Sequence, residues 1–531
     1  MNTALPFSSG RQPVLARNIV STSQPLAAQA GAAVFARGGN AIDAALAAAI
    51  CLTVVEPVMN GIGGDAFALV WDGDRLHGLN ASGRAPRAWS AERFAHLPQM
   101  PRNGWDTVTV PGGVAAWKAL SERFGALPFE DLFRDAIRHA RDGFPVSPVI
   151  ARQWKQAVAD LGHQPGFGAF TIDGRAPEAG EIWRMPDQAD TLADIAATGT
   201  ESFYRGRLAQ AVADFARQHG AGLALEDLAD HAVEWVEPIA TTFGDRTVYE
   251  IPPNGQGIAA LIAIGLLEHL PAYRDTAAGS AARMHLEIEA MRLAFADLYA
   301  HVADADHMRV SAAQLLDPAY LRARAARIDP ARAGAHPAGQ PASGGTVYLC
   351  AADAQGRMVS FIQSNFKGFG SGVVVPGTGI SLHNRGMGFV TSAGHPNQVA
   401  GGKRPMHSII PAFTMRGGKP HMAFGVMGGN MQAQGHLQMT LREAVEGLNP
   451  QACSDAPRWR IDDSGALTVE HTVAGDVVEG LRALGHAPVV AGADSLDFGS
   501  AQVICRLDVG DGGVAYVAGS DHRRDGQAVG W

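Results

Sequence analysis

The stretch Gly344–Gln363 reads GGTVYLCAADAQGRMVSFIQ, and the character of the chain changes within it. Up to this point, residues 331–345 are mostly Ala, Gly, Pro and Ser without an aromatic residue, which is typical of a mobile linker. Two apolar runs then follow, Thr346–Ala352 and Met358–Gln363, separated by a short turn sequence, and they predict a β-hairpin. A linker that enters a hairpin indicates a boundary, and residues 346–531 are numerous enough for a core of their own.

Composition narrows the class of protein. The chain has 531 residues, of which 47% are hydrophobic and 18% charged, below the roughly 25% charged residues usual for soluble domains. This balance excludes a wholly disordered chain. The net charge is −9, whereas a nucleic-acid-binding protein is expected to be basic. We therefore expect a folded protein that binds no nucleic acid.

Neither a targeting segment nor a membrane span is predicted. The first twenty residues lack the apolar core of a signal peptide, and the longest early apolar run, Ala44–Val55, is too short to cross a bilayer. The four cysteines are scattered without CxxC spacing, which argues against a disulfide framework or a zinc site. We expect a cytoplasmic protein with no metal and no other cofactor.

The N-terminal third predicts helices and short strands. Ser23–Arg37 has helical spacing, and Asn40 can cap a following helix through the Ala44–Val55 run. Gly61–Gly64 precedes an apolar strand, Ala66–Trp71, and lacks the GKS/T of a phosphate-binding loop, so a tight turn with close packing is favoured.

A polar cluster follows the helix predicted over Met284–His301. Metal ligation is conceivable there, but a polar loop at a helix end is the favoured interpretation. The cluster consists of His301, Asp304, Asp306 and His307.

Thr346 is a candidate nucleophile if the chain is cut after Gly345. It would then carry a free α-amine, whose pKa of about 7.7–8.0 suits a general base for its own hydroxyl. The glycines before it tolerate the strained backbone that self-cleavage requires. The alternative is an ordinary Gly-Gly-Thr at the start of a strand.

Several blocks together resemble the γ-glutamyltransferase superfamily of N-terminal nucleophile hydrolases, and the similarity extends from about Val20 to the closing residues 521–526. The resemblance implies an αββα sandwich made as a precursor that cleaves itself before a threonine. The large part, residues 1–345 with the linker 331–345, and the small part, residues 346–531, would then stay associated. The blocks are Gly38–Asp43, Glu56-Pro57 with Gly61–Gly64, Val110–Gly112, Ala140–Phe144, Pro252-Pro253 and Asp455–Arg458.

The resemblance also implies roles for single residues. Thr346 takes the place of the family nucleophile, at the matching distance before Asp353 and Gly356. In Gly425–Gly429 the amides of Gly428 and Gly429 take the place of the oxyanion donors. Two further positions lie in Gln363-Ser364-Asn365: Ser364 matches a hydroxyl that bonds the nucleophile, and Asn365 is a candidate substrate contact.

This chain departs from the family at the motifs that bind the γ-glutamyl group. The family arginine position holds Ser82, with Arg84 two residues later, and the family asparagine position holds Phe366. The acidic pair is replaced by Met387-Gly388, and the serine pair by His407-Ser408. A γ-glutamyl ammonium would lack partners, at a cost of several kcal/mol. Arg84, His407 and Ser408 are therefore candidate contacts for a carboxylate, with Arg385 and Arg404 as further candidates.

The leading hypothesis is an autoprocessing amidohydrolase of the amidohydrolase or acylase branch, which hydrolyses a small carboxylate-bearing amide through an acyl-threonine. One alternative is a γ-glutamyl hydrolase or transferase that acts on glutathione. Another is an unprocessed relative that binds without catalysis. The expected partners are a small amide and the two parts of the chain itself, with homo-oligomerisation left open.

Overall fold

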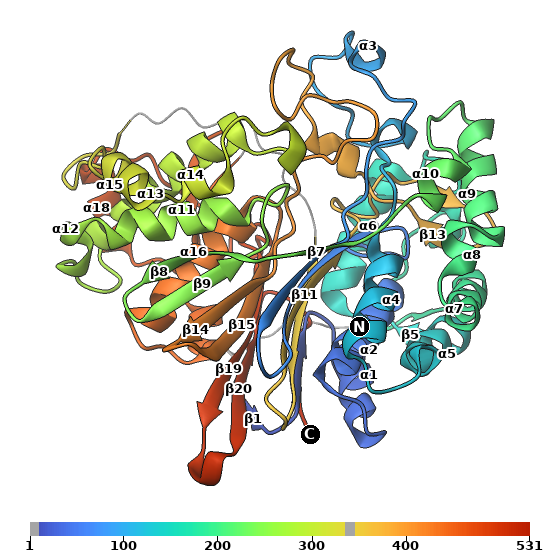
Figure 1. The fold of residues 1–531 in the computed structure, drawn as a ribbon, viewed down its shortest axis with the longest axis horizontal. Helices are drawn as coiled ribbons and strands as arrows, with labels where there is room; N and C mark the ends of the chain where they lie inside the picture. Colours follow the sequence, from blue (N-terminus) through green and yellow to red (C-terminus); the bar gives the residue numbers. More distant parts are fainter. Residues whose placement is uncertain (1–9, 335–345, 463) are drawn as a thin grey trace.

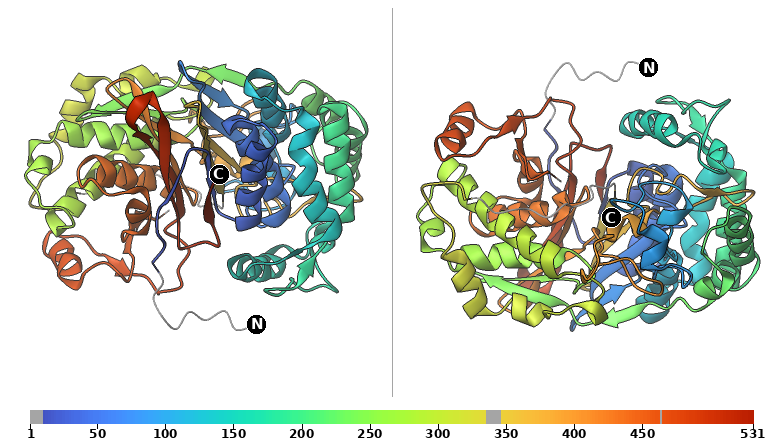
Figure 2. Two further views of the ribbon diagram at one scale, coloured as in Figure 1. Left: turned by 90° about the horizontal axis from the view of Figure 1, so that it is seen from below. Right: turned by 90° about the horizontal axis from the view of Figure 1, so that it is seen from above.

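Two seven-stranded antiparallel sheets lie face to face, with helices on both outer faces (Figures 1 and 2). The computed structural model describes residues 10–334, 346–462 and 464–531. The four layers form an αββα sandwich, so the predicted fold class is confirmed.

The strands of the two sheets come from distant parts of the chain. Sheet A runs in the order β1 (Val14–Ala16), β20 (Val514–Ser520), β19 (Ser500–Asp508), β15 (Lys419–Met427), β14 (Ala412–Arg416), β9 (Arg246–Glu250), β8 (Ile239–Phe243). Sheet B runs in the order β21 (Gln527–Gly530), β2 (Ile19–Thr22), β10 (Val347–Ala352), β11 (Met358–Ser364), β3 (Asp65–Trp71), β4 (Leu76–Asn80), β7 (Glu234–Val236). Smaller sheets pair β5 (Phe144–Pro145) with β6 (Ile182–Trp183), β12 (Val374–Val375) with β13 (Ile380–Ser381), and β16 (Trp459–Ile461), β17 (Leu467–Val469) and β18 (Val489–Val490).

The helices form two groups, which lie on opposite sides of the sandwich (Figure 1). The group on the side of sheet B contains α1 (Pro25–Ala36), α2 (Ala41–Val55), α4 (Gly113–Phe124), α5 (Arg134–Asp142), α6 (Pro148–Leu161), α7 (Pro186–Thr198), α8 (Glu201–Tyr204), α9 (Arg207–Gln218) and α10 (Leu225–Ala229). The group on the side of sheet A contains α11 (Gly257–Glu268), α12 (Pro271–Arg274), α13 (Ala281–His301), α14 (Ala312–Leu315), α15 (Pro318–Ala325), α16 (Met431–Ala444), α17 (Pro450–Asp455) and α18 (Gly475–Ala483). A short α3 (Ala91–Phe94) lies at the top of this view.

The hairpin predicted from the sequence lies in the middle of sheet B. Strands β10 and β11 pair in the register Tyr348↔Ile362, and β2 and β3 flank them. Both sheets therefore combine strands from before and after residue 345. Strands β10 and β11 bury their side chains among residues of the N-terminal part, while a smaller core cluster, which includes Phe424 and Val503, comes from residues after 345 alone.

The two sheets pack closely where β10 of the hairpin faces β15. A core of side chains from both sheets, including Tyr348, Phe67 and Phe413, fills the space between them. The Tyr348 ring lies over Gly425 of β15, where an added Cβ would come within 2.4 Å of the ring. Glycine at this position therefore lets the start of β10 approach the end of β15.

The cap of α2 also holds the hairpin turn. The side chain of Asn40 accepts hydrogen bonds from the amides of Ile42 and Asp43, and Asp43 accepts one from the Asn40 amide, which completes a capping box. Oδ2 of Asp353, in the β10–β11 turn, accepts from the Ala41 amide at 2.9 Å. The predicted cap is confirmed, and it joins the Gly38–Asp43 block to the turn of the hairpin.

Other sequence expectations are met locally. Gly61–Gly64 packs closely, since a Cβ on Gly61 would lie 2.2 Å from the Ser381 hydroxyl oxygen. All four cysteines are buried and none is in a disulfide. Within the part of the chain that the structure describes, no helix has both the length and the apolar character that a membrane crossing requires. Most of the predicted linker, residues 335–345 with Gly345, lies outside the described residues.

Candidate active site

The hydroxyl of Thr346 lies at the beginning of β10, inside the sandwich. Thr346 is 1% exposed, and Nε2 of Gln432, in the first turn of α16, donates a hydrogen bond to its Oγ1 at 3.0 Å. Oε1 of the same amide accepts from the Ile410 backbone at 3.0 Å, which fixes the orientation of the amide. The Thr346 oxygen therefore faces a donor that cannot rotate away.

Two glycines form the turn between β15 and α16. Gly428 and Gly429 have φ values of +124° and +64°, both in the region that favours glycine. Their carbonyls accept from the first amides of α16, while among the described residues neither of their own N–H groups donates a hydrogen bond. Consecutive amides in such a turn, at the positive end of a helix, can bind an anion. The predicted oxyanion donors thus lie three and four residues before Gln432.

Ser364 ends β11 beside the candidate nucleophile. Val347 pairs with Gln363, so the same register, continued by one residue, places Ser364 opposite Thr346. The Ser364 hydroxyl oxygen accepts from the Phe366 amide at 2.6 Å. The structure brings these two predicted residues together across the hairpin.

Asn365 turns away from this pair. Its side chain is fully buried, and its Nδ2 donates to the Ser381 hydroxyl at 2.9 Å, against the Gly61 turn. This contact supports the wall of the site.

A cavity of about 290 Å³, which we call cavity I, adjoins the glycine turn. Gln256 connects the two, because its Nε2 donates to the carbonyls of Ser408 and Gly429. No described lining residue is a carboxylate. The lining residues are Gln256, Tyr299, Val302, Phe366, Met387, Gly388, Phe389, Val390, Ser392, His395, Asn397, Met406, Ser408 and Asn430.

A buried arginine lies behind two of these lining residues. Nη1 of Arg385 donates to the Ser408 hydroxyl oxygen at 3.0 Å, and the guanidinium lies 4.6 Å from the centre of the Phe366 ring. Arg385 is 1% exposed, and its Nε and Nη2 have no hydrogen-bond partner among the described residues. Because the Ser408 oxygen accepts from Arg385, its own proton is left to donate elsewhere.

Asp65 faces Arg385 from the other side. Its Oδ2 lies 2.8 Å from Nε2 of His407 and 3.7 Å from Nε of Arg385. Burial raises the pKa of Asp65 to about 7, against the lowering effect of Arg385, and burial also lowers the pKa of Arg385 to about 9. Burial, with Arg385 nearby, holds the pKa of His407 well below its usual range. His407 is therefore neutral and donates to Asp65.

His407 does not line cavity I. It is fully buried, its ring contacts the Phe67 ring edge-on at 4.7 Å, and its Nε2 is hydrogen-bonded to Asp65. The sequence predicted that His407 contacts the substrate directly, whereas in the structure its side chain points into the core. Its neighbour Ser408 does line the cavity.

Arg84 lies in a different cavity, of about 220 Å³, together with Arg404. Its Nη1 donates to Asp304 at 3.2 Å, and its Nη2 to Glu234 at 3.3 Å. Nη1 of Arg404 also donates to Glu234 at 2.7 Å. The structure does not bring Arg84 to cavity I, and its charge is already matched by carboxylates. Asp304, predicted in a polar loop, takes part in this ion-pair cluster.

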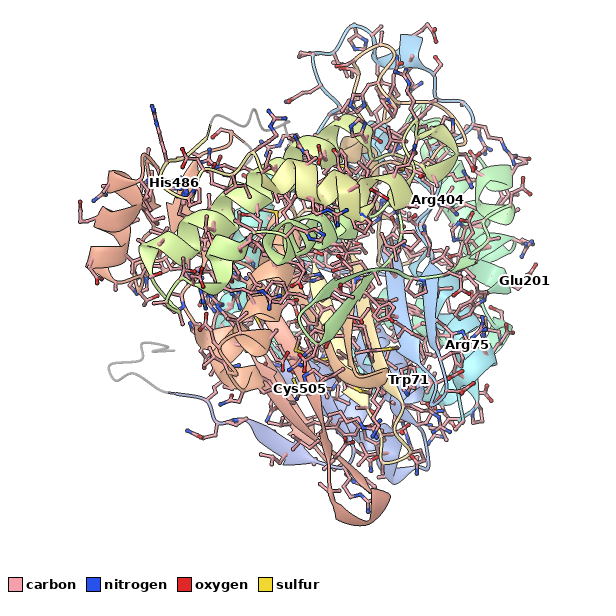
Figure 3. All side chains as sticks on the ribbon, turned by 60° about the vertical axis from the view of Figure 1, so that its left-hand side comes forward. Trp71, Arg75, Glu201, Arg404, His486 and Cys505 are labelled. Atoms are coloured by element: carbon pink, nitrogen blue, oxygen red, sulfur yellow. The ribbon has the colours of Figure 1, made fainter. Side chains whose placement is uncertain are left out.

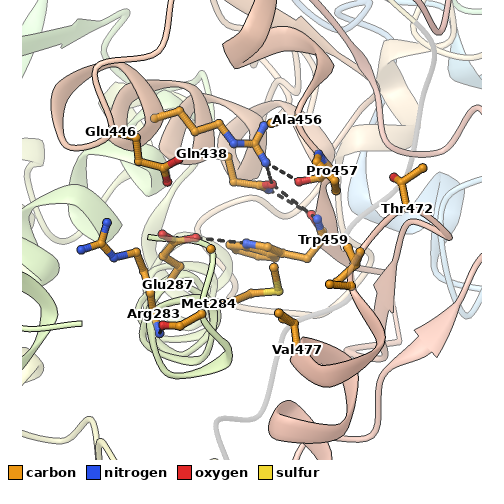
Figure 4. Close-up of a pocket in the computed structure, with 15 residues that line it drawn as sticks. Arg283, Met284, Glu287, Gln438, Glu446, Ala456, Pro457, Trp459, Thr472 and Val477 are labelled. Atoms are coloured by element: carbon orange, nitrogen blue, oxygen red, sulfur yellow. Dashed lines mark hydrogen bonds between the residues drawn. The ribbon is translucent and has the colours of Figure 1, made fainter. Parts of the chain in front are cut away.

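Another cavity of about 280 Å³ lies among α13, α16 and the segment from residue 456 to α18 (Figure 4). Glu287 lies in it and accepts hydrogen bonds from the Tyr273 hydroxyl and from the Trp459 indole N–H. Thr346, Ser364 and the glycine turn do not line it. Glu287 is therefore engaged in structural hydrogen bonds away from the candidate nucleophile.

Sequence reasoning missed Gln432 and Gln256. A signal was present for the first, because three glutamines, Gln432, Gln434 and Gln438, occur within seven residues of a helix that begins directly after the glycine pair. All three are buried. A buried amide requires partners, so such a run indicates a polar site or a buried network.

A buried threonine at the start of a central strand of an αββα sandwich is the arrangement of N-terminal nucleophile hydrolases. The chain belongs to the gamma-glutamyltranspeptidase family, whose sequence model matches residues 27–531. Its relatives are hydrolases and acylases named as proenzymes, and this chain is accordingly an enzyme of that kind.

Three relatives match nearly the full length. The chain is 33% identical to the glutathione hydrolase-like YwrD proenzyme of Bacillus subtilis, covering 97% of this chain and 98% of the relative. It is 35% identical to the oxamate amidohydrolase proenzyme of Klebsiella pneumoniae, covering 95% and 97%. The crystal structure of cephalosporin acylase from Bacillus halodurans matches with 45% identity and a TM-score of 0.94, covering 100% and 99%.

Proposed function

We propose that the chain cleaves itself between Gly345 and Thr346 and then hydrolyses a small carboxylate-bearing amide through an acyl-threonine. The observation that supports this most is the Thr346 hydroxyl, buried beside a fixed donor and next to a turn with two amides directed to no other described residue. The two resulting parts, residues 1–345 and 346–531, would remain associated because both contribute strands to both sheets.

Self-cleavage follows from the same hydroxyl. Thr346 Oγ1 attacks the carbonyl carbon of Gly345, its proton passes to the Thr346 nitrogen as the C–N bond breaks, and an ester forms. Water then hydrolyses the ester, which leaves a carboxylate on Gly345 and a free amine on Thr346. A buried site favours this step because the amides of Gly428 and Gly429 stabilise the developing oxyanion.

The mature site repeats this chemistry on substrate. The Thr346 amine accepts the hydroxyl proton as Oγ1 attacks the substrate amide, and it returns the proton to the leaving amine. Gln432 Nε2 holds Oγ1 in place, and Ser364 supports Thr346 from the neighbouring strand. Water then releases the acyl group.

We assign the acyl group to cavity I and its carboxylate to Ser408, with Arg385 behind it. Arg385 directs the Ser408 proton outward and supplies a buried guanidinium whose Nε and Nη2 have no hydrogen-bond partner among the described residues. This replaces the sequence expectation for Arg84, whose charge is taken up by Asp304 and Glu234. His407 does not contact the substrate in this assignment; it is hydrogen-bonded to Asp65, and Asp65 in turn lies beside Arg385.

The absence of a lining carboxylate among the described residues of cavity I opposes a γ-glutamyl substrate. A γ-glutamyl ammonium would have no anionic partner there. The names of the oxamate amidohydrolase and cephalosporin acylase relatives also support a substrate other than a γ-glutamyl compound. Because another relative is named glutathione hydrolase-like, the experiment must also test the γ-glutamyl alternative.

A matched pair of substrates tests the proposal. Glutaryl and γ-glutamyl anilides differ only in the α-ammonium group. We expect the processed enzyme to favour the glutaryl compound by at least about 100-fold in kcat/KM, because a desolvated ammonium without a partner is strongly rejected. Preference for the γ-glutamyl anilide would establish the alternative. An intact chain that turns over neither these anilides nor oxamate would indicate the non-catalytic relative.

A further inference from the structure

A buried group of three possible metal ligands lies away from the active site. His285 and Glu289 are one turn apart on α13, and His486 follows α18. One ligand atom of each lies within 4.8 Å of the others, and the three residues are 0%, 0% and 6% exposed. Figure 3 places His486 on the opposite side of the view from Arg404, and none of the three lines cavity I.

The hydrogen bonds fix which ring nitrogens face each other. Nε2 of His285 lies 2.8 Å from the Asp329 carbonyl, which can only accept, so this nitrogen carries the proton. Nδ1 of a neutral His285 is then a lone pair, and it lies 2.7 Å from Nε2 of His486. A single proton, on His486, must therefore fill the contact between the two rings.

The second ring nitrogen of His486, Nδ1, also indicates that the contact between the two rings is incomplete without a cation. Its Nδ1 is buried without a hydrogen-bond partner among the described residues. In the tautomer with the proton on Nε2, this nitrogen is a buried lone pair that accepts no hydrogen bond from the described residues, which is unfavourable. If a cation took the place of the proton between the rings, the proton could move to Nδ1 and His486 would remain neutral.

We propose that His285, Glu289 and His486 bind one divalent transition-metal ion of the zinc type. His285 Nδ1, His486 Nε2 and a Glu289 carboxylate oxygen supply the two imidazoles and one carboxylate that such ions accept, and a tetrahedral ion keeps one position for water. A metal–nitrogen distance of about 2.0–2.1 Å requires the two rings to separate slightly from their 2.7 Å contact.

The groups around the ligands have the form of an outer shell. The Asp329 carbonyl accepts from His285, and the Gly334 amide donates to Glu289 Oε2 at 2.7 Å. Such partners orient ligands and select the ring tautomer. They belong to one segment, Asp329–Gly334, whose Ala333 amide also donates to the Leu484 carbonyl at 2.7 Å. The ion would therefore join α13, the end of α18 and this segment, a structural role separate from catalysis.

The test uses the full-length chain without a histidine tag, treated with a chelator and then dialysed against Co²⁺ or Zn²⁺. We expect one ion per chain by mass spectrometry of the metal, visible absorption of tetrahedral Co²⁺, and a higher Tm in the loaded protein. His486→Gln and Glu289→Gln should each weaken the affinity at least tenfold, on the order of the loss caused even by outer-shell changes.

His421→Gln is the matched control. His421 forms a comparable pair with Glu443 at 2.8 Å, but no third ligand completes a group there among the described residues. It should retain the wild-type stoichiometry and absorption. The proposal is overturned if the wild type binds no ion, or if both ligand variants bind as the wild type does. Should His486→Gln fail to fold, Glu289→Gln, which has nearly the same shape, decides the question.

Discussion

Nε2 of Gln432 and Oγ1 of Thr346 are 3.0 Å apart, although the two residues are 86 positions apart in the chain. The amide is held from its other end by the Ile410 backbone, so its donor cannot follow a displaced hydroxyl. The geometry of the candidate nucleophile therefore depends on α16 as much as on its own strand.

Gln432→Leu should lower kcat by about tenfold or more, because one hydrogen bond to the reacting oxygen is worth about 1–2 kcal/mol. The measurement is single-turnover hydrolysis of an activated amide. Gln438→Leu is the control: it removes a buried amide of the same helix that bonds the Trp459 carbonyl and not Thr346. Equal losses in the two variants would show a general effect of helix disruption.

Gly428→Ala should reduce both self-cleavage and turnover on the order of 100-fold, the scale for loss of one oxyanion donor. Its φ of +124° disfavours a side chain, and the new Cβ would lie 3.1 Å from the Gly499 backbone. Gly417→Ala has similar backbone strain, at φ +56°, but enters open space in the β14–β15 turn. Processing bands on a denaturing gel should change in the first variant alone.

Arg385→Gln should raise KM for a glutaryl anilide by at least about tenfold, since a charge-assisted contact is worth about 1.5–3 kcal/mol. Ser408→Ala should raise it in the same direction. Arg84→Gln should leave KM near the wild-type value, because Arg84 lies in another cavity. If KM rose in Arg84→Gln and not in Arg385→Gln, Arg84 would be the residue that binds the substrate carboxylate.

Asp65→Asn should remove one component of the pH dependence of stability. The pKa of Asp65 is raised to about 7, so between pH 4 and 7 the folded chain holds a proton that the unfolded chain releases. This group therefore stabilises the fold at low pH, and its contribution is lost as the pH rises through 7. The difference in Tm between wild type and variant, measured over this range, should change with that sign. Asp74→Asn, at an exposed position, should show no such trend.

Asp521→Ala should lower the free energy of unfolding by about 3–5 kcal/mol, the usual cost of leaving a buried charge without its partner. Asp521 accepts from Arg458 at 2.7 Å, and neither residue is exposed. Urea unfolding of the uncleaved Thr346→Ala chain provides the measurement. Asp214→Ala, which breaks an exposed pair with Arg217, should cost less than about 1 kcal/mol. Similar costs for the two variants would contradict this prediction.

Local patterns predicted local structure well. The capping box at Asn40, the hairpin over β10 and β11, and the helix that ends at His301 all follow from nearest-neighbour chemistry, and each is present within a few residues of its expected bounds. The glycine turn that we propose for the oxyanion was located by its resemblance to a family motif. Its left-handed backbone at Gly428 and Gly429 agrees with the need for glycine there.

Contacts between distant segments were not predictable in the same way. The sequence favoured Arg84 as the carboxylate partner, with Arg385 and Arg404 as further candidates. In the structure Glu234 and Asp304 lie against Arg84, whereas Arg385 keeps two buried N–H groups without hydrogen-bond partners among the described residues. His407, adjacent to Ser408, points to Asp65 and not into cavity I.

The sequence by itself determined the family, the position of Thr346 before a strand, and the loss of the polar groups that a γ-glutamyl ammonium needs. The tertiary structure alone decided that Gln432 meets Thr346, that Arg385 lies behind Ser408, and that residues before and after 345 pack together between the two sheets. The physical reason is that spacing along the chain sets backbone geometry, whereas charge pairing and burial depend on which elements the stacked sheets bring together.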